Sequence, residues 1–341
     1  MRVLHITNNY PSEKNPAFGA FVQSQVASLQ DEGVDCAVFF VDGRGAPWRY
    51  LWAWLRLLWH LLTHQYDVLH CHHALTGVLL CLTGAPLFSK CVLSYQNSPS
   101  REWGRGTFHL LYPFFRRFII KVREEDYEGY KKVRVIPNGC SSELFRPMDK
   151  AECRRTLDLE PEGRYVLFID ANARRAARKH SQKRKDRFDV VLSHLRERFG
   201  NSVHPVILQD EFPSRMPLWY NAADLLMVTS DYEGSPNAVK ECLMCNAPVV
   251  ATPVGDLPFL AKYCPDCHVI PDFDSDSLAQ KAWEVMAGVV GGAGRALAGD
   301  GLASEGTGSD SLSSRDALLK LGYGLEDTAR NILKTYRESL L

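Results

Sequence analysis

The stretch that decides the fold is Leu225–Glu241, which reads LLMVTSDYEGSPNAVKE. Its first part, Leu225–Thr229, is an apolar run typical of a buried strand in a parallel sheet. Ser235 and Pro236 end a short polar loop, and these residue types favour the N-cap and the first position of a helix. The helix itself is predicted over Asn237–Cys245. A strand that turns directly into a helix is half of a β-α-β unit, so the stretch predicts an α/β fold.

The same alternation of strand and helix extends along the chain in both directions. In the first half, near-continuous apolar runs predict strands at Val3–Ile6, Ala37–Val41, Asp67–His70, Cys91–Tyr95 and Val133–Ile136. The helices predicted there are Gly19–Gly33, Trp48–Leu62 and Phe108–Val122. In the second half, further strands are predicted at Tyr165–Ile169, Pro205–Leu208, Pro248–Thr252 and His268–Ile270, with helices at Phe188–Phe199 and Ser277–Ala287. The pattern predicts two Rossmann-like, doubly wound domains with a ligand-binding cleft between their carboxyl-edge loops.

The domain boundary is expected just after the turn signal Ile136–Gly139. This assigns residues 1–143 to an N-terminal domain and residues 144–324 to a C-terminal domain. Residues 325–341 form an amphipathic helix that is predicted to pack back on the N-terminal domain. Residues 288–314 are rich in Gly, Ala and Ser without an apolar period, so they are interpreted as a flexible insertion.

The composition is that of a soluble globular protein of two domains. The chain has 341 residues, of which 45% are hydrophobic and 23% are charged. Its 40 basic residues equal its 40 acidic residues, so no global attraction to nucleic acid is expected. No signal-peptide pattern and no stretch long enough to span a bilayer is apparent, which predicts a cytoplasmic protein. The ten cysteines are then expected to be buried thiols.

The chemistry of the deciding stretch lies at the start of its helix. The amide groups that follow Pro236 lack partners within the helix and form a site for an anion such as a diphosphate. Glu233 and Glu241 lie on either side of that site and can accept hydrogen bonds from hydroxyl groups. The stretch therefore suits a sugar, a diphosphate and a ribose in sequence. The candidate ligand-binding residues around Glu233 are Gly234, Ser235, Pro236, Asn237, Ala238 and Glu241.

The pattern E-G-x-P-N-x-x-x-E at Glu233–Glu241, followed by PVVATPVGD at Pro248–Asp256, closely resembles the family 4 retaining glycosyltransferases of the GT-B fold. Asp67–His72 and Val133–Pro147 are similar to further stretches of that family. So is the region in which Tyr10-Pro11 leads to Phe18–Val22. The resemblance implies that Glu233 meets the donor sugar, that Glu241 holds the ribose of a nucleoside diphosphate sugar, and that no metal or other cofactor is needed.

The family also places one Arg and one Lys on the donor diphosphate, shortly before the helix that corresponds to Phe188–Phe199. Here that region is a basic run, consisting of Arg174, Arg175, Arg178, Lys179, Lys183, Arg184, Lys185 and Arg187. Most of the run is interpreted as a solvated loop. Arg178 and Lys185 are the predicted diphosphate pair, acting with Glu233 as the catalytic group. Gly19 is either a helix-start glycine or a point where the backbone approaches the donor phosphate.

The acceptor side departs from the family. Ser94–Pro99 stands where the family usually has a His-containing loop, and the first domain is shorter than expected. Tyr95, Gln96 and Asn97 are the predicted acceptor-side residues.

Two groups of residues could be either metal ligands or ordinary packed side chains. Cys242, Cys245, Cys264 and Cys267 have the spacing of a zinc ribbon. His70 and His72 alternate onto one face of a strand. Packing is the favoured interpretation of both groups, so no metal is predicted.

Four of the seven tryptophans, Trp48, Trp52, Trp54 and Trp59, lie in one predicted helix together with Arg56. Core packing accounts for part of this helix, but Trp and Arg also favour the headgroup region of a membrane. Phe114–Lys121 has a similar character. A lipid-linked acceptor on the cytoplasmic face of a membrane is therefore one hypothesis.

The sequence predicts a retaining glycosyltransferase that moves a hexosyl unit from a nucleoside diphosphate sugar to a saccharide or lipid-linked glycan. One alternative is a trimmed, non-catalytic protein that binds a sugar nucleotide or a partner transferase. Another is a sugar-nucleotide epimerase. A dinucleotide-dependent oxidoreductase is disfavoured because no G-x-G-x-x-G follows the first strand. Nucleic-acid binding is disfavoured because the basic run has no interleaved aromatic residues.

Overall fold

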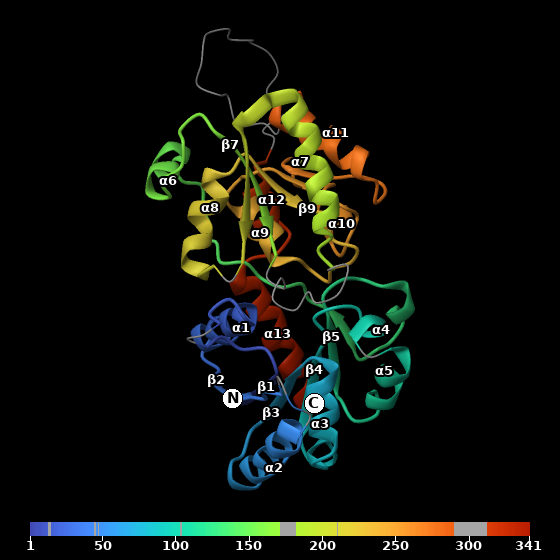
Figure 1. Ribbon diagram of the computed structural model, residues 1–341. Coiled ribbons are helices and arrows are strands. Elements are labelled where there is room, and N and C mark those ends of the chain that lie inside the picture. Colours follow the sequence, from blue (N-terminus) through green and yellow to red (C-terminus); the bar gives the residue numbers. More distant parts are fainter. Residues whose placement is uncertain are drawn as a thin grey trace. The chain divides into compact units, whose positions relative to one another are not determined.

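The computed structural model describes residues 1–12, 15–43, 46, 48–102, 104–170, 182–209, 211–289 and 312–341 (Figure 1). They form two compact units, which are Met1–Gly139 with Tyr323–Leu341, and Cys140–Gly322. The division falls after residue 139 rather than after 143, and the C-terminal helix belongs to the first unit. Most of the predicted insertion at 288–314 lies outside the described residues. Both units are α/β with a parallel sheet, as the sequence predicts.

The first unit is built on a six-stranded parallel sheet in the order β2-β1-β3-β4-β5-β6. The strands are β1 (Arg2–Thr7), β2 (Asp35–Phe40), β3 (Val68–His72), β4 (Lys90–Ser94), β5 (Arg117–Ile120) and β6 (Val133–Val135). The helices are α1 (Ala20–Asp31), α2 (Trp48–Thr63), α3 (Ala74–Cys81), η1 (Ala85–Leu87), α4 (Pro99–Glu102), α5 (Arg105–Leu111), η2 (Glu125–Tyr127) and α13 (Leu325–Leu340). The strand order reverses between β1 and β3, and ligands bind α/β sheets at such a switch point.

One prediction for the first unit is wrong. The sequence predicts a helix over Phe108–Val122, but α5 ends at Leu111 and the chain then forms strand β5. Pro113 follows α5 closely, and proline cannot donate a hydrogen bond inside a helix. The residues of β5 after Arg117 are all buried, as expected for an apolar, β-branched run inside a covered sheet.

Helix α13 closes the core of the first unit. Ala329, Ile332 and Tyr336 are fully buried in one cluster with Val3 and Leu29 from the N-terminal part of the chain. The amphipathic pattern of the C-terminal residues therefore has a direct cause, because one face of α13 covers the sheet of this unit.

A layer of buried histidines lies beside α13. His5 on β1 and His70 and His72 on β3 have no exposed surface. His70 Nδ1 is 2.6 Å from the Tyr336 hydroxyl and its Nε2 is 2.7 Å from Ser94 Oγ, while His5 Nδ1 is 3.1 Å from His72 Nε2. Burial lowers the pKa of His5 to about 3. Burial and the neighbouring charges lower the pKa values of His70 and His72 well below the usual range, so the layer is neutral at pH 7.

The second unit is built on a five-stranded parallel sheet in the order β11-β10-β9-β7-β8. The strands are β7 (Arg164–Ile169), β8 (Val203–Leu208), β9 (Leu225–Val228), β10 (Val249–Ala251) and β11 (Cys267–Val269). The helices are α6 (Lys150–Thr156), α7 (Lys185–Phe199), η4 (Gly200–Ser202), η5 (Pro213–Arg215), α8 (Met216–Ala222), α9 (Asn237–Met244), α10 (Leu257–Leu260), α11 (Ser275–Met286) and α12 (Ser314–Lys320). Strand β9 lies in the middle of this sheet, so the loop after it emerges at the centre of the carboxyl edge.

Within the described part of the chain, no helix has the length and apolar character needed to cross a membrane. All ten cysteines are free thiols.

We expect the free energy of unfolding of the first unit to fall as the pH drops below about 6.5, the usual histidine pKa. The unfolded chain takes up a proton on each histidine near that pH, whereas the buried histidines stay neutral, so acid favours unfolding. Each buried histidine contributes up to roughly 1.4 kcal/mol per pH unit. Urea unfolding followed by circular dichroism from pH 7.5 down to 5.5 measures the slope.

The variant His72→Gln removes one of these protonation sites and should flatten the slope. The control His109→Gln changes an exposed histidine and should leave the slope as it is. An equal slope in all three proteins would contradict the assignment to the buried layer.

Candidate functional site

The loop between β9 and α9 carries Glu233, and its carboxylate is held by two groups. Oε1 accepts a hydrogen bond from Lys183 Nζ at 2.6 Å and another from Ser230 Oγ at 2.8 Å. The side chains of Lys183 and Glu233 are only 20% and 13% exposed, so solvent screens this ion pair less than a surface pair. Glu233 therefore has a defined position at the carboxyl end of β9.

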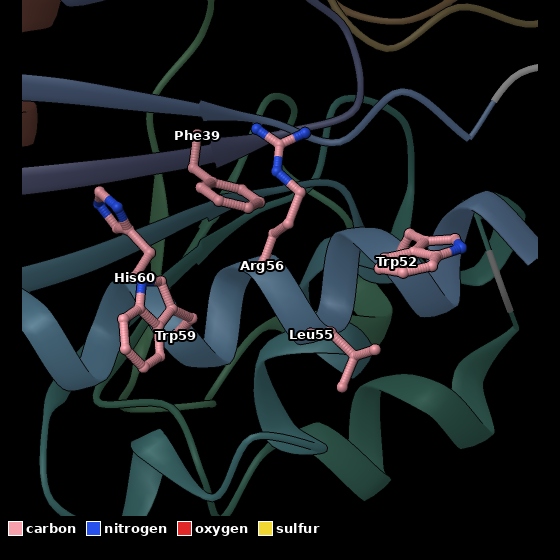
Figure 2. A pocket seen from close by; sticks show the side chains of 6 residues that line it. All are labelled: Phe39, Trp52, Leu55, Arg56, Trp59 and His60. Carbon is pink, nitrogen blue, oxygen red and sulfur yellow. The ribbon is translucent and has the colours of Figure 1, made fainter.

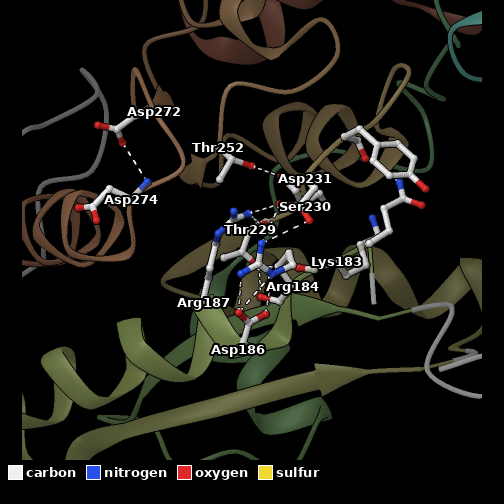
Figure 3. Close-up of polar contacts among 12 residues, drawn as sticks. Lys183, Arg184, Asp186, Arg187, Thr229, Ser230, Asp231, Thr252, Asp272 and Asp274 are labelled. Carbon is white, nitrogen blue, oxygen red and sulfur yellow. Dashed lines mark hydrogen bonds and ion pairs between the residues drawn. The ribbon is translucent and has the colours of Figure 1, made fainter. Parts of the chain in front are cut away.

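A second network ties the segment before α7 to the same loop (Figure 3). Thr229 Oγ1 donates a hydrogen bond to the backbone carbonyl of Lys183 at 2.7 Å. Arg187 Nη1 lies 2.8 Å from Asp231 Oδ1, and Arg184 Nη1 lies 3.0 Å from the same oxygen. Arg184 has φ 51°, in the left-handed region that residues other than glycine rarely adopt. The network thus stabilises a tight turn that brings Lys183 to Glu233.

Lys183 is the described lysine that contacts Glu233. The assignment of Lys185 to the donor diphosphate stays a prediction. Lys185 Nζ pairs with Asp189 Oδ1 at 2.6 Å along α7, and both side chains are about half exposed. Arg178 and the rest of the first part of the basic run lie outside the described residues. A sequence signal separates the two lysines, because an acid four residues after Lys185 is typical of a pair on a helix surface.

The start of α9 differs in one respect from the prediction. Pro236, not Ser235, is the N-cap residue, and no side chain caps the helix. Ser235 Oγ instead donates a hydrogen bond to Asp256 Oδ2 at 2.6 Å. The first amides of a helix, here those of Asn237 and Ala238, have no partners within it, so they remain open to an anion. Asn237 Oδ1 is also buried, with no partner among the described residues.

Lys240 is a functional candidate that the sequence reasoning missed. Its side chain is fully buried, and Nζ donates hydrogen bonds to the Ser235 carbonyl at 3.2 Å and to Ser235 Oγ at 2.5 Å. Burial lowers the pKa of Lys240, while the charge of Asp256 acts in the opposite direction. Ser235 thus bridges a buried lysine and a buried aspartate beneath the start of α9.

A close backbone contact joins this loop to the next one. A Cβ on Gly255 would lie 2.2 Å from the carbonyl oxygen of Gly234, and Gly255 has φ +59°. Only glycine satisfies both conditions. This contact is a physical reason for the glycine in the Pro248–Asp256 stretch.

Glu241 lies within α9 and is partly exposed. Its Oε2 accepts a hydrogen bond from the Tyr220 hydroxyl on α8 at 2.7 Å. Burial raises the pKa of Glu241, and the Tyr220 hydrogen bond and the charge of Lys240 offset only part of that shift. Tyr220 orients the carboxylate and leaves Oε1 without a partner among the described residues.

In the first unit, the three predicted acceptor-side residues have different environments. Tyr95 has no exposed surface and packs among aromatic rings that include Phe108 and Phe118. The backbone amides of Gln96 and Asn97 donate hydrogen bonds to Glu102 Oε1 at 2.5 and 3.0 Å. Tyr95 is therefore a core residue, whereas Gln96 and Asn97 belong to a loop organised by Glu102.

Glu102 is the centre of a polar group that sequence reasoning also missed. Its Oε1 is 3.5 Å from His73 Nδ1, and its Oε2 accepts a hydrogen bond from the Ala74 amide at 3.0 Å. Burial alone would raise the pKa of Glu102, but the hydrogen bonds from His73 and from backbone amides lower it overall. His73 Nε2 is 2.7 Å from Asn9 Nδ2, and His73 has φ 77° and ψ 148°, which is nearly restricted to glycine. A strained polar residue at the β1/β3 switch point marks a candidate binding site.

Gly19 is the N-cap residue of α1, with φ 76°. A Cβ there would lie 2.3 Å from the backbone carbon of Asn9. The fold itself therefore requires glycine at this position, and contact with a donor phosphate stays a prediction.

Among the described residues, the group with metal-binding geometry is His5, His70 and His72, each with one ring nitrogen within 4.8 Å of the others. Both nitrogens of His70 are already bonded to protein hydroxyls, which accounts for its burial without an ion. Cys242, Cys245, Cys264 and Cys267 are buried and form no such group.

Residues 176–287 match the family model described as Glycosyl transferases group 1. The chain is similar to D-inositol 3-phosphate glycosyltransferases. The protein from Thermobispora bispora is 29% identical over 37% of this chain and 36% of that protein. The one from Pseudarthrobacter chlorophenolicus is 26% identical over 57% of this chain and 56% of that protein. The matches thus span about a third to just over half of the length of these relatives.

Solved structures are similar over nearly the whole chain. Sucrose-phosphate synthase from Thermosynechococcus elongatus has a TM-score of 0.68 at 15% identity, covering 99% of this chain and 98% of that one. HepE from Anabaena in complex with UDP has a TM-score of 0.64 at 14% identity, covering 98% and 99%. The fold predicted from the sequence is thereby confirmed. The match to the glycosyl transferases group 1 model lies within the second unit, and the chain has the GT-B fold.

Proposed function

We propose that this chain is a retaining glycosyltransferase that moves a hexosyl unit from a nucleoside diphosphate sugar to a saccharide or lipid-linked glycan. The observation that carries the proposal is the placement of two carboxylates around the start of α9. Glu233 is held there by Lys183 and Ser230, and Glu241 is held within the helix by Tyr220.

The donor binds at α9 in this proposal. The uncapped amides of Asn237 and Ala238 and the positive end of the helix dipole hold the diphosphate. Glu233 accepts hydrogen bonds from the donor sugar, and Glu241, with one oxygen unpaired among the described residues, accepts those of the ribose. Solved structures of HepE, a protein of similar fold, are complexes with UDP and with UDP-glucose, which supports this class of donor.

Lys183 neutralises the leaving group. Its ammonium group pairs with Glu233 when no donor is bound, and a diphosphate at α9 offers it a second, more highly charged partner. Stabilising the charge that develops on the departing diphosphate is the main catalytic requirement of such a transfer. In this proposal Lys183 and the helix terminus meet that requirement, with no resident metal ion.

The acceptor binds to the first unit through the polar group around Glu102. Asn9 and His73 lie where β1 and β3 end, and Glu102 fixes His73 and the backbone of Gln96 and Asn97. Hydrogen-bonding side chains in fixed positions suit the hydroxyl groups of a sugar.

The donor is first identified by a thermal-shift screen of UDP-, GDP- and ADP-sugars, because a bound ligand raises the melting temperature. Release of nucleoside diphosphate from that donor then supports transfer. Binding without release would favour the non-catalytic alternative, and conversion to an isomeric sugar without an acceptor would favour an epimerase.

Lys183→Met should lower kcat for nucleoside diphosphate release by roughly a hundredfold, the usual effect of removing one group that stabilises developing charge. Lys185→Met is the matched control, since Lys185 pairs with Asp189 on the helix surface. Its kcat should stay within about twofold of the unchanged protein. Equal losses in the two variants would refute the assignment of Lys183.

Glu241→Gln should weaken donor binding by roughly tenfold or more, because a charge-assisted hydrogen bond to the ribose becomes a neutral one. Isothermal titration with the identified donor measures the Kd. Glu197→Gln changes an exposed glutamate of α7 and should have no effect. A donor Kd that does not change in Glu241→Gln would remove Glu241 from the site.

Ser235→Ala should destabilise the second unit by about 1–3 kcal/mol, because Lys240 and Asp256 lose the hydroxyl that bridges them. The same change should weaken donor binding, since the bridge fixes the loop before α9. Ser193→Ala removes an exposed hydroxyl and should change stability by less than about 0.5 kcal/mol. Urea unfolding and donor titration of both variants test the two effects separately.

A further inference from the structure

Helix α2 has two apolar faces, and the fold of the first unit covers one of them. On the inner face Ala53 and Leu57 are buried, and Trp54 and Leu61 pack partly against the same core. The outer face carries a continuous stripe at helical spacing, here called the α2 surface. It consists of Trp48, Leu51, Trp52, Leu55, Trp59 and Leu62. Inward packing explains the inner residues of α2, but no element among the described residues covers the α2 surface.

The side chains of the α2 surface are exposed to an extent unusual for large apolar residues. Trp48 and Trp52 are each 61% exposed, Trp59 is 70% exposed and Leu62 is 74% exposed. Phe88, in the turn after η1, is 90% exposed, and it lines a depression of about 430 Å³ together with Leu62. The apolar area therefore extends from one element to another. A contiguous exposed patch of this kind marks an interaction site.

The edge of the α2 surface is basic. Residues 43–66 contain no Asp or Glu, whereas Arg49, Arg56 and His60 are part of α2. Asp42, just before this stretch, lies 3.7 Å from Arg49, and the net charge of the edge stays positive. Figure 2 shows Arg56 beside Phe39, and Arg56 lines one shallow depression together with Leu55 and Trp59. The Arg56 guanidinium carbon is 5.8 Å from the centre of the Phe39 ring. Long basic side chains at the margin of an apolar face can reach anionic headgroups while that face enters the lipid.

These observations distinguish between two occupants of the α2 surface. A second copy of this chain would bring the same net basic edge close to itself, so that like charges would meet. A bilayer with anionic lipids supplies both the apolar interior and the negative headgroups. Tryptophan also favours the boundary between lipid and water. We propose that the α2 surface docks this chain peripherally on a membrane that contains anionic lipid.

Docking buries the three exposed tryptophans at the level of the headgroups and places Arg49 and Arg56 among the phosphates. The attraction is part apolar and part electrostatic, so salt weakens it without abolishing it. This inference does not rest on the proposed transferase function, because its test requires no donor, acceptor or turnover.

The experiment is flotation of the full chain with vesicles of phosphatidylcholine alone or with phosphatidylglycerol, at low and high salt. We expect binding to the vesicles that contain phosphatidylglycerol, with a blue shift of tryptophan fluorescence, and weaker binding at high salt. The double variant Trp52→Ser, Trp59→Ser should lower the partition coefficient by roughly tenfold or more. Its melting temperature should not fall, because both side chains are exposed.

Phe212→Ser is the matched control, since Phe212 is 55% exposed but belongs to the second unit. It should bind vesicles as the unchanged protein does. The charge variant Arg49→Glu, Arg56→Glu should lose the preference for phosphatidylglycerol.

Three outcomes would overturn the proposal. The first is no binding to either kind of vesicle. The second is equal binding by the Trp52→Ser, Trp59→Ser variant, which would place the contact elsewhere. The third is a dimer in light scattering that this variant dissociates, together with no vesicle binding, which would assign the α2 surface to a second copy of the chain.

Discussion

The buried ammonium group of Lys240 is the interaction on which the proposed donor site depends. It donates hydrogen bonds to the carbonyl and the hydroxyl of Ser235, and that hydroxyl donates in turn to Asp256. A buried lysine is costly unless such partners satisfy it, so the loops after β9 and β10 are held together. Because Asp256 takes the Ser235 hydroxyl, that hydroxyl does not cap α9. The amides at the start of the helix are thereby left open to a ligand.

The opposite side of the same loop is fixed by a turn. Arg184 adopts the left-handed conformation immediately before α7, and its ion pair with Asp231 connects that turn to the loop after β9. The turn gives the two flanking lysines different environments. Lys183 precedes it and reaches Glu233, whereas Lys185 follows it and becomes part of the exposed helix surface. Lys183 and Lys185 are thus only two positions apart in the chain, yet the ion pair of Lys183 is shielded from solvent and that of Lys185 is exposed.

Patterns that depend on burial could be predicted from the sequence, whereas choices between equivalent polar partners could not. The parallel strands and the β9–α9 stretch follow from apolar periodicity and turn chemistry. Ser235 was predicted as a helix cap because its residue type favours that role. In the structure the Ser235 hydroxyl instead donates a hydrogen bond to Asp256, and no local sequence rule connects these two residues. Glu102 escaped notice for the same reason, since its partners come from the loops after β3 and β4. The error at Phe108–Val122 is of another kind, because Pro113 was a local signal that the chain changes from helix to strand.

Although the net charge of the chain is zero, its charges are unevenly distributed. This uneven distribution bears on the choice of acceptor. Residues 43–66 contain no acid, and the exposed face of α2 is apolar. A freely diffusing saccharide would give no reason for such a surface. A lipid-linked glycan would give such a reason, because a protein docked on the same membrane meets this acceptor at a high effective concentration. The first unit carries both the α2 surface and the polar group around Glu102. Of the two acceptor classes that the proposed function allows, the α2 surface therefore favours the lipid-linked one.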